Sequence, residues 1–288
     1  MIIAVVSDPR DPRLADYRNI PDPELVERRG IFVAEGRLVV QRLLSDGLLA
    51  TRSVMVTDTA LETIRPFIAV HPDVPIYVVP QPVMDGVAGF NVHRGCLAIG
   101  ERPVARAWRT LARDARVLLI LERIGDPDNV GSIFRNAAAF GVDAVLLDPA
   151  STDPLYRKAI RTSMGAALKI PFARVDNWPN ALNDLAREDM AVVALTPSPA
   201  VPCLHTIAKQ FSGRRVALVL GHEGDGLSPE ALEACELRAR IAMSGGSDSI
   251  NVATAAAIAL YELAGRHLSA EASAKAEGPP YNAERRNV

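Results

Sequence analysis

The chain divides into two parts by the way its hydrophobic positions are spaced. From Val117 onward, five short runs are apolar at nearly every position: VLLILE, DAVLLD, MAVVALT, RVALVLG and LRARIAM. Helical patterning separates them, and continuous apolar strands are typical of a parallel sheet covered by helices on both faces. The pattern therefore predicts an α/β domain with a mainly parallel sheet over residues 117–268.

The first hundred residues predict a second, smaller α/β domain. A strand is expected at 31–33 and an amphipathic helix at about 37–44, which ends near Gly47. The β-rich runs RSVMVTD, IYVVP and RGCLAIGE follow. We assign residues 1–101 to this domain, with an ordered core at about 20–101.

Residues 102–116 predict a linker helix with a stripe of arginines along one face. At 100° per residue, these arginines fall within roughly 80° of one another, opposite an apolar face. They are Arg102, Arg106, Arg109, Arg113 and Arg116. The stripe is either a solvated helix face, which is the usual role of a charge run, or a phosphate-binding surface, toward which the use of arginine alone points.

The end of the chain contains a helix and a tail. The run INVATAAAIALYELAGRH is apolar nearly all round, which predicts burial in a core or in a subunit interface. The tail at 269–288 has little apolar surface to bury and is predicted to be disordered.

Composition narrows the classes of function. The chain has 288 residues and a net charge of −2, so any nucleic-acid binding must use a local basic patch. Cys96, Cys203 and Cys235 lie far apart without a C-x-x-C, and HEGDG lacks a second histidine, so neither disulfides nor a metal site is expected. No apolar run has the length of a signal core or a membrane span, which predicts a cytoplasmic protein.

Three glycine-rich loops follow predicted strands, where α/β proteins bind ligands. In the first loop, ERIGDPDNVGSIFRN, Asn129 is the predicted N-cap of a helix. Gly131 lies one turn before Arg135, and without a Cβ there the guanidinium would have room to reach the strand-end loop.

The second and third loops are LGHEGDGLSPE and MSGGSDSINVAT. Glu223 is the one acid among three glycines of the second loop, after which Ser228 is expected to cap a helix. Ser249 of the third loop is a candidate N-cap for the last helix. The glycine signatures of Rossmann and P-loop proteins and the G-x-S-x-G of α/β-hydrolases are absent.

Taken in order, the three loops resemble the three motifs of the SpoU/TrmH family of RNA 2′-O-ribose methyltransferases. The resemblance extends over about residues 25–265, and FVAEGRLVVQRLL is similar to the family's ribosomal-protein-like substrate-binding domain. Ala242 and Ile250 depart conservatively from the family pattern. The motif positions are Asn129, Gly131 and Arg135; Gly221, Glu223, Gly224 and Gly226; and Ile241, Met243, Ser249, Asn251 and Val252.

The resemblance implies a trefoil-knotted C-terminal domain that binds S-adenosylmethionine and forms a homodimer through its knot helices. The implied cofactor-binding residues are Leu195, Thr196, Gly221, Ile241, Met243 and Ile250. The implied substrate is a ribose hydroxyl of rRNA or tRNA, and the N-terminal domain would select the RNA.

The resemblance also assigns activation of the hydroxyl to Arg135. Because an arginine is hardly ever deprotonated in a protein, we interpret Arg135 as a residue that binds the neighbouring phosphate and orients the hydroxyl. The residues that would hold Arg135 and the ribose in place are Asn129, Glu223, Ser249 and Asn251. The candidate RNA-binding residues are Arg106, Arg109 and Arg113 of the stripe and Arg157 and Arg161 of LYRKAIRTSMGAALKIPFAR.

Two alternatives stay open at this point. One is a knotted methyltransferase that acts on a base. The other is a non-catalytic RNA-binding or ribosome-assembly factor with the same fold, against which the intact Arg135, Glu223 and Asn251 count.

Overall fold

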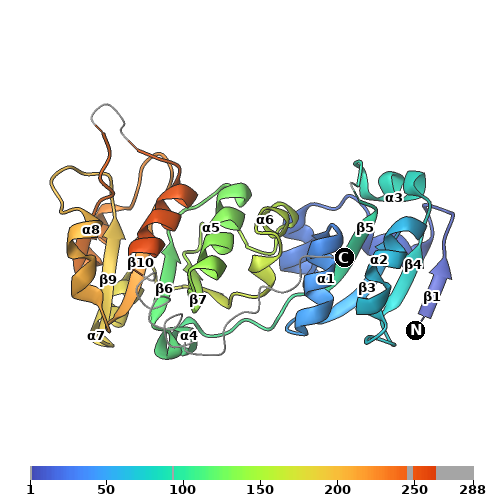
Figure 1. Cartoon of the computed structure of the whole chain (residues 1–288), viewed down its shortest axis with the longest axis horizontal. Helices are drawn as coiled ribbons and strands as arrows, with labels where there is room; N and C mark the ends of the chain where they lie inside the picture. Colours follow the sequence, from blue (N-terminus) through green and yellow to red (C-terminus); the bar gives the residue numbers. More distant parts are fainter. Residues whose placement is uncertain (1, 93, 245–248, 264–288) are drawn as a thin grey trace, which may run out of the picture.

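Two sheets, one in each half of the chain, organise the computed structural model, which describes residues 2–92, 94–244 and 249–263. The two α/β domains lie end to end along the long axis of the molecule (Figure 1). Among the described residues, no helix has the length and apolar character needed to cross a membrane.

The N-terminal domain holds a five-stranded sheet with the strand order β1-β4-β3-β5-β2. Strands β1, β4 and β3 are parallel to one another, and β5 is antiparallel to both of its neighbours. The strand and helix expected after residue 30 are both present. The elements are β1 (Ile2–Val5), β2 (Ile31–Glu35), α1 (Arg37–Asp46), β3 (Thr51–Val56), α2 (Asp58–Ile68), β4 (Pro75–Val78), α3 (Gln81–Ala88) and β5 (Cys96–Glu101).

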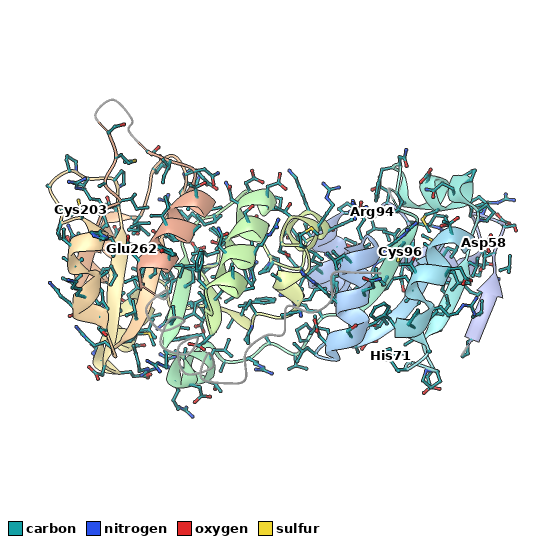
Figure 2. The ribbon with its side chains drawn as sticks, in the orientation of Figure 1. Asp58, His71, Arg94, Cys96, Cys203 and Glu262 are labelled. Atoms are coloured by element: carbon teal, nitrogen blue, oxygen red, sulfur yellow. The ribbon has the colours of Figure 1, made fainter. Side chains whose placement is uncertain are left out.

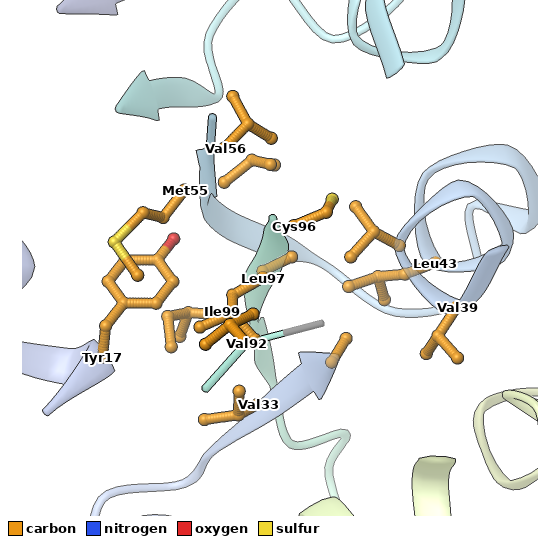
Figure 3. Close-up of a cluster of buried hydrophobic side chains, with 14 of the residues drawn as sticks. Tyr17, Val33, Val39, Leu43, Met55, Val56, Val92, Cys96, Leu97 and Ile99 are labelled. Carbon is orange, nitrogen blue, oxygen red and sulfur yellow. The ribbon is translucent and has the colours of Figure 1, made fainter. Parts of the chain in front are cut away.

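The ordered core of this domain begins earlier than the predicted residue 20. Strand β1 pairs with β4, and Leu14 and Tyr17 are buried in the domain core. The Tyr17 hydroxyl lies 2.7 Å from the Ser53 Oγ, and its ring packs beside Met55 (Figure 3). The prediction was wrong because the partners of these residues lie far along the chain, where local patterning does not reach.

The C-terminal domain holds a six-stranded sheet with the order β11-β9-β10-β6-β7-β8, and all its neighbouring strands are parallel. The five predicted strands are present, and β8 is an additional strand of three residues. The elements are α4 (Trp108–Asp114), β6 (Val117–Leu121), α5 (Pro127–Ala139), β7 (Ala144–Leu147), α6 (Arg157–Thr162), β8 (Phe172–Arg174), α7 (Asn180–Arg187), β9 (Met190–Leu195), α8 (Leu204–Ile207), β10 (Arg215–Leu220), α9 (Pro229–Ala234), β11 (Leu237–Ala239) and a last helix at 252–263.

Both faces of this sheet are covered, which explains its continuous apolar strands. In β6, Leu119 and Leu121 face a cluster formed with α5 and the helix at 252–263. Leu118 and Ile120 face the opposite cluster, which contains residues of α4, α7 and α9. Successive side chains of a strand point to opposite faces, so a strand between two helical layers needs apolar residues at every position.

The predicted linker helix forms only in its second half, because α4 begins at Trp108. Pro103 lacks a backbone N–H and disfavours helical geometry in the residue before it, which works against a helix through 102 and 103. Arg102 leaves the predicted stripe altogether, since its Nη2 lies 2.7 Å from the Oδ2 of buried Asp153. The prediction that all five arginines lie on one face of a single helix was therefore wrong.

The two domains share part of one hydrophobic cluster. Leu155, Ile160 and Leu168 of the C-terminal half pack into the core of the N-terminal domain, and α6 packs against β2. Polar contacts surround this junction: the Tyr156 hydroxyl donates to Glu27 over 2.6 Å, and Lys169 lies 2.9 Å from Asp46. Burial of apolar side chains across the junction holds the two domains in one relative position.

Close packing of α5 on α6 yields a stability prediction. A Cβ at Gly131 would lie 2.5 Å from the carbonyl oxygen of Ala159, a backbone atom that has little freedom to move. We expect Gly131→Ala to lower the free energy of unfolding by about 1–2 kcal/mol, because overpacking exceeds the gain in helix propensity.

Gly86→Ala is the matched control, since Gly86 lies within α3 and a Cβ there meets nothing within 4 Å. This variant should raise the free energy of unfolding by about 0.5–1 kcal/mol. Urea denaturation of both variants checks the pair, and equal shifts of the same sign would contradict the packing argument.

Candidate functional site

A cavity of about 430 Å³ lies at the carboxyl ends of β9 and β10 and beside the segment that follows β11. Neighbouring parallel strands end at the same edge of a sheet, so the segments after β9, β10 and β11 meet there. All the residues predicted to bind the cofactor line this cavity, namely Leu195, Thr196, Gly221, Ile241, Met243 and Ile250. Glu223 and Ser249 line it as well.

The loop after β10 folds tightly back on itself. A Cβ at Gly221 would lie 2.4 Å from the carbonyl carbon of Gly226, so only glycine fits at the start of the loop. The His222 Nδ1 accepts hydrogen bonds from the backbone N–H groups of Gly224 and Asp225, over 3.0 and 3.2 Å. Gly221 thus makes room for the loop's own backbone, which gives the cavity one of its walls.

A buried carboxylate, Glu122, anchors the end of this loop through hydrogen bonds. It follows β6, is only 2% exposed and accepts hydrogen bonds from the Trp178 Nε1 and from both the backbone N–H and the hydroxyl of Ser228, over 2.6–2.8 Å. Ser228 also caps α9 as predicted, because its Oγ accepts from the N–H of Ala231. The adjacent Arg123 donates from its Nη2 to the carbonyl of Gly226 over 3.2 Å.

The sequence interpretation did not single out Glu122. The sequence feature that could have indicated it is a lone acid at the end of an otherwise apolar strand. A buried acid in such a place needs hydrogen-bonding partners, so it predicts contacts with other segments. Its partners lie near residues 178 and 228, which local patterning does not connect to it.

Three side chains form a hydrogen-bonded chain that joins the three loops. The Asn251 Nδ2 donates to the Asn129 Oδ1 over 2.8 Å, and the Asn129 Nδ2 donates to the Glu223 Oε1 over 2.5 Å. Asn129 therefore uses both ends of its amide. We call this set, Asn129, Glu223 and Asn251, the amide bridge.

The helix caps predicted in the first and third loops were wrong. Helix α5 begins at Pro127 with Asp126 as its N-cap, so Asn129 lies in the first turn and its side chain is available to other loops. The cap of the last helix is Asn251, whose Oδ1 accepts from the N–H groups of Ala253 and Thr254. Ser249 lies too far ahead of the helix for this role.

Helix α5 lies beside the helix at 252–263 along most of its length (Figure 1). The Asn136 Nδ2 donates to the carbonyl of Ala253 over 2.8 Å, and the rings of Phe140 and Tyr261 meet edge to face at 6.3 Å between centroids. The helix that carries Arg135 is thus held at several points against the third loop and its helix.

Arg135 is exposed on α5 and makes no ion pair or hydrogen bond with any residue that the structure describes. It lies about 9 Å along the helix axis from Asn129, and helical side chains lean back toward the N-terminus. The predicted role of Gly131 was wrong, because the missing Cβ makes room for α6 rather than for the guanidinium.

The N-terminal turn of α5 also carries a paired acid. The Asp128 Oδ1 accepts from the Thr162 hydroxyl and its Oδ2 lies 2.8 Å from the Lys158 Nζ. The hydrogen bond from Lys158, followed by that from Thr162, holds the pKa of Asp128 below its usual value. Asp128 is therefore a fixed negative charge that ties α5 to α6.

The predicted RNA-binding arginines do not lie together. Helix α4 precedes β6, and Arg215 at the start of β10 donates to the carbonyl of Ala115, so Arg106, Arg109 and Arg113 belong to the edge of the sheet opposite the cavity. Arg109 also pairs with Asp184 at 2.7 Å. Contact of these arginines with RNA stays a prediction.

Arg157 and Arg161 lie at the junction between the domains. The Arg157 guanidinium stacks 4.6 Å above the ring of Phe90, and the Arg161 Nη1 lies 3.7 Å from the Glu35 Oε1. Their charges are accessible on one side, but each also has a structural partner.

Two of the three cysteines are buried, and Cys203 is partly exposed. Burial raises the pKa of the Cys96 and Cys235 thiols to about 12, so both stay protonated at neutral pH. No group of three histidine, cysteine, aspartate or glutamate side chains in the described part of the chain is placed to hold a metal ion.

Comparison with known proteins gives matches over most of the chain. The SpoU rRNA Methylase family matches residues 116–261. An uncharacterised tRNA/rRNA methyltransferase of Mycobacterium bovis is 41% identical over 89% of this chain and 90% of its own length. The 23S rRNA (guanosine-2′-O-)-methyltransferase RlmB of Xylella fastidiosa is 34% identical over 64% of this chain and 75% of its own length.

A solved structure extends the match to both domains. The crystal structure of an S-adenosylmethionine-bound rRNA methyltransferase from Sinorhizobium meliloti superposes with a TM-score of 0.77 and 26% identity, covering 92% of this chain and 98% of that one. All three glycine-rich loops, of which the second and third line the cavity, fall within the residues that the family matches. This chain belongs to the SpoU rRNA Methylase family.

Proposed function

We propose that this protein uses S-adenosylmethionine to methylate a ribose 2′-hydroxyl in structured RNA, either rRNA or tRNA. The observation that carries the proposal is the amide bridge, which fastens the helix bearing Arg135 to a loop of the cavity and to the start of the last helix. The name of the Xylella fastidiosa relative, a guanosine-2′-O-methyltransferase, supports a ribose as the acceptor.

The cavity suits the proposed cofactor in size and in chemistry. Ligand sites of this class measure about 300–1,000 Å³ and combine apolar walls with a few polar groups. Ile241, Met243 and Ile250 supply an apolar slot for an adenine ring, and the backbone at Leu195 and Thr196 supplies polar groups. When bound there, S-adenosylmethionine would supply an electrophilic methyl group on its sulfonium.

Arg135 acts in this proposal as a fixed cation. Its guanidinium stays protonated, so it binds a phosphate oxygen next to the target ribose and orients the hydroxyl. The hydroxyl proton passes to a phosphate oxygen or to water rather than to Arg135. Asn129, Glu223 and Asn251 hold the three loops in register, and Ser249 provides a hydroxyl at the cavity wall.

The proposal includes a homodimer formed through the last helix. One side of the helix at 252–263 is buried in the domain core, whereas Ile258 and Tyr261 on the other side are 38% and 64% exposed. An apolar helix with large exposed side chains is stabilised when a second copy covers it. The knot implied by the family resemblance stays a prediction.

The reaction itself is tested by incubating the protein with methyl-labelled S-adenosylmethionine and separate pools of unmodified rRNA and tRNA, followed by digestion to nucleosides. We expect labelled 2′-O-methyl nucleosides from one of the two pools. Label on a base would show that the methyl acceptor is a base and not a ribose. Cofactor binding without transfer to either pool would favour a non-catalytic RNA-binding factor.

The role of the tight loop is tested by Gly221→Ala. A Cβ would collide with the backbone of Gly226 and Leu227 and push out one wall of the cavity. We expect the Kd for S-adenosylmethionine, measured by calorimetry, to rise at least about tenfold. Gly125→Ala, where a Cβ meets nothing within 4 Å, is the control and should change the Kd less than about twofold.

The role of Arg135 is tested by two substitutions with the same assay. Arg135→Ala should lower kcat by about 100-fold or more, because the phosphate and the hydroxyl lose their orienting cation. Arg135→Lys keeps the charge without the bidentate geometry and should recover only part of the rate. The Kd for S-adenosylmethionine should stay unchanged in both variants, since Arg135 does not line the cavity. Near-full activity of Arg135→Lys would contradict bidentate binding.

A further inference from the structure

Arg123, the second residue after β6, has a left-handed backbone conformation with a φ of +55°. A residue with a Cβ is strained in this region of backbone space. Among the described residues, three others that are not glycine share a positive φ, namely Arg94, Met164 and Asp189. Arg94 lies in the N-terminal domain (Figure 2), Met164 follows α6 and Asp189 precedes β9. Of these four, Arg123 is the one that follows a strand of the larger sheet at the edge where the cavity lies.

The surrounding structure fixes this strained backbone in place. The N–H of Arg123 donates to the Oδ1 of buried Asp148 over 3.0 Å, and the N–H of Ile124 donates to the Ser151 Oγ over 3.1 Å. The same Oδ1 accepts from the N–H and the hydroxyl of Ser151 over 2.8 and 2.6 Å. Strained conformations persist where their surroundings determine them in several ways, and they are concentrated at functional sites. The geometry of Arg123 therefore calls for a functional explanation.

The guanidinium of Arg123 contacts the residues that close the loop after β10. Its Nη2 donates to the carbonyl of Gly226 over 3.2 Å, and its Nη1 lies 3.8 Å from the Oδ2 of exposed Asp225. The N–H of Gly226 in turn donates to the carbonyl of His222 over 3.0 Å, which closes the loop on itself. Gly226, Asp225 and His222 all line the cavity, whereas Arg123 does not. Arg123 thus holds one wall of the cavity from its outer side.

The left-handed conformation lets two consecutive residues hold the same segment. Glu122 accepts from the N–H and the hydroxyl of Ser228, and Arg123 donates to Gly226, two residues earlier. In an extended strand, successive side chains point to opposite faces, so the two could not both reach one loop. The two anchors are also not interchangeable. A carbonyl oxygen only accepts hydrogen bonds, so the anchor of Gly226 must be a donor, and the Glu122 carboxylate is an acceptor.

We infer that Arg123 is a positioning residue for S-adenosylmethionine, which keeps the loop after β10 in the shape that forms the cavity wall. The inference rests on the proposed function for the place of the cofactor in this cavity. Arg123 carries two costs in stability, namely its strained backbone and its buried Nε, which has no hydrogen-bond partner among the described residues. Its removal should therefore weaken cofactor binding without weakening the fold.

The test is Arg123→Gly, because glycine adopts a positive φ without strain. We expect the Kd for S-adenosylmethionine, measured by calorimetry, to rise about fivefold or more, since the loop loses a hydrogen bond from a charged donor. The melting temperature of the cofactor-free protein should stay within about 2 °C of the wild type or rise. Amide hydrogen exchange in residues 221–228 should become faster in the cofactor-free variant. KM for the cofactor should rise, while kcat at saturating cofactor changes less than about twofold.

Three further variants separate the side chain from the backbone. Arg123→Asn keeps a Cβ and tolerates the left-handed conformation, but its shorter side chain lacks the guanidinium, so its Kd should rise as in Arg123→Gly. Arg123→Lys keeps a long, charged donor and should raise the Kd less than about threefold. The matched control is Asp189→Gly, since exposed Asp189 has a φ of +61° and precedes β9, at the opposite end of the sheet. This control should change the Kd less than about twofold.

A wild-type Kd in both Arg123→Gly and Arg123→Asn would overturn the inference. So would a loss of affinity that accompanies a fall of many degrees in the melting temperature of both variants, because Arg123 would then serve the fold as a whole. Failure of the proposed function has a different signature, since the wild type itself would show no heat of binding with S-adenosylmethionine.

Discussion

Asn129 makes the contact on which the candidate site depends, because its single amide joins two other loops. It accepts from Asn251 and donates to Glu223, which lie 122 and 94 residues away along the chain, so three distant segments are tied at one point. Each such hydrogen bond adds only about 0.5–3 kcal/mol to stability. The main effect of the amide bridge is to fix the three loops in position relative to one another. The buried Glu122 has the larger effect on stability, since removing a partner of a nearly inaccessible carboxylate leaves a charge without compensation.

The parallel sheet explains why these residues meet at all. Strands β6, β9 and β10 are neighbours and parallel, so the loops after them open at one edge. The opposite edge holds α4 and its arginines, where Arg215 donates to several carbonyls at the end of the helix. Whether a helix precedes or follows its strand therefore decides at which end of the sheet its side chains lie. Helix α4 with Arg109 precedes β6, whereas α5 with Arg135 follows it, so the two arginines lie at opposite ends.

Arginines in this protein perform different tasks that their sequence spacing does not distinguish. Arg102 and Arg174 lie beside the buried Asp153, and Arg157 stacks on Phe90 across the domain junction. Arg37, Arg94 and Arg135 have no carboxylate partner among the described residues. The charge of a paired arginine is partly neutralised by its carboxylate partner. The arginines without such a partner are therefore the better candidates for phosphate binding.

The sequence by itself determined the fold class, the five main strands of the larger sheet and the three glycine loops. These follow from local patterns, because apolar runs and glycines act within a few residues of one another. The six candidate cofactor-binding residues, all among those that line the cavity, came instead from the resemblance of the loops to the family motifs. The tertiary structure decided that β1 joins the smaller sheet, that α4 begins only at Trp108, that Gly131 makes room for α6 and that Glu122 anchors a distant loop. Each of these depends on a partner far away in the chain, and such a contact has no signature in the spacing of neighbouring residues.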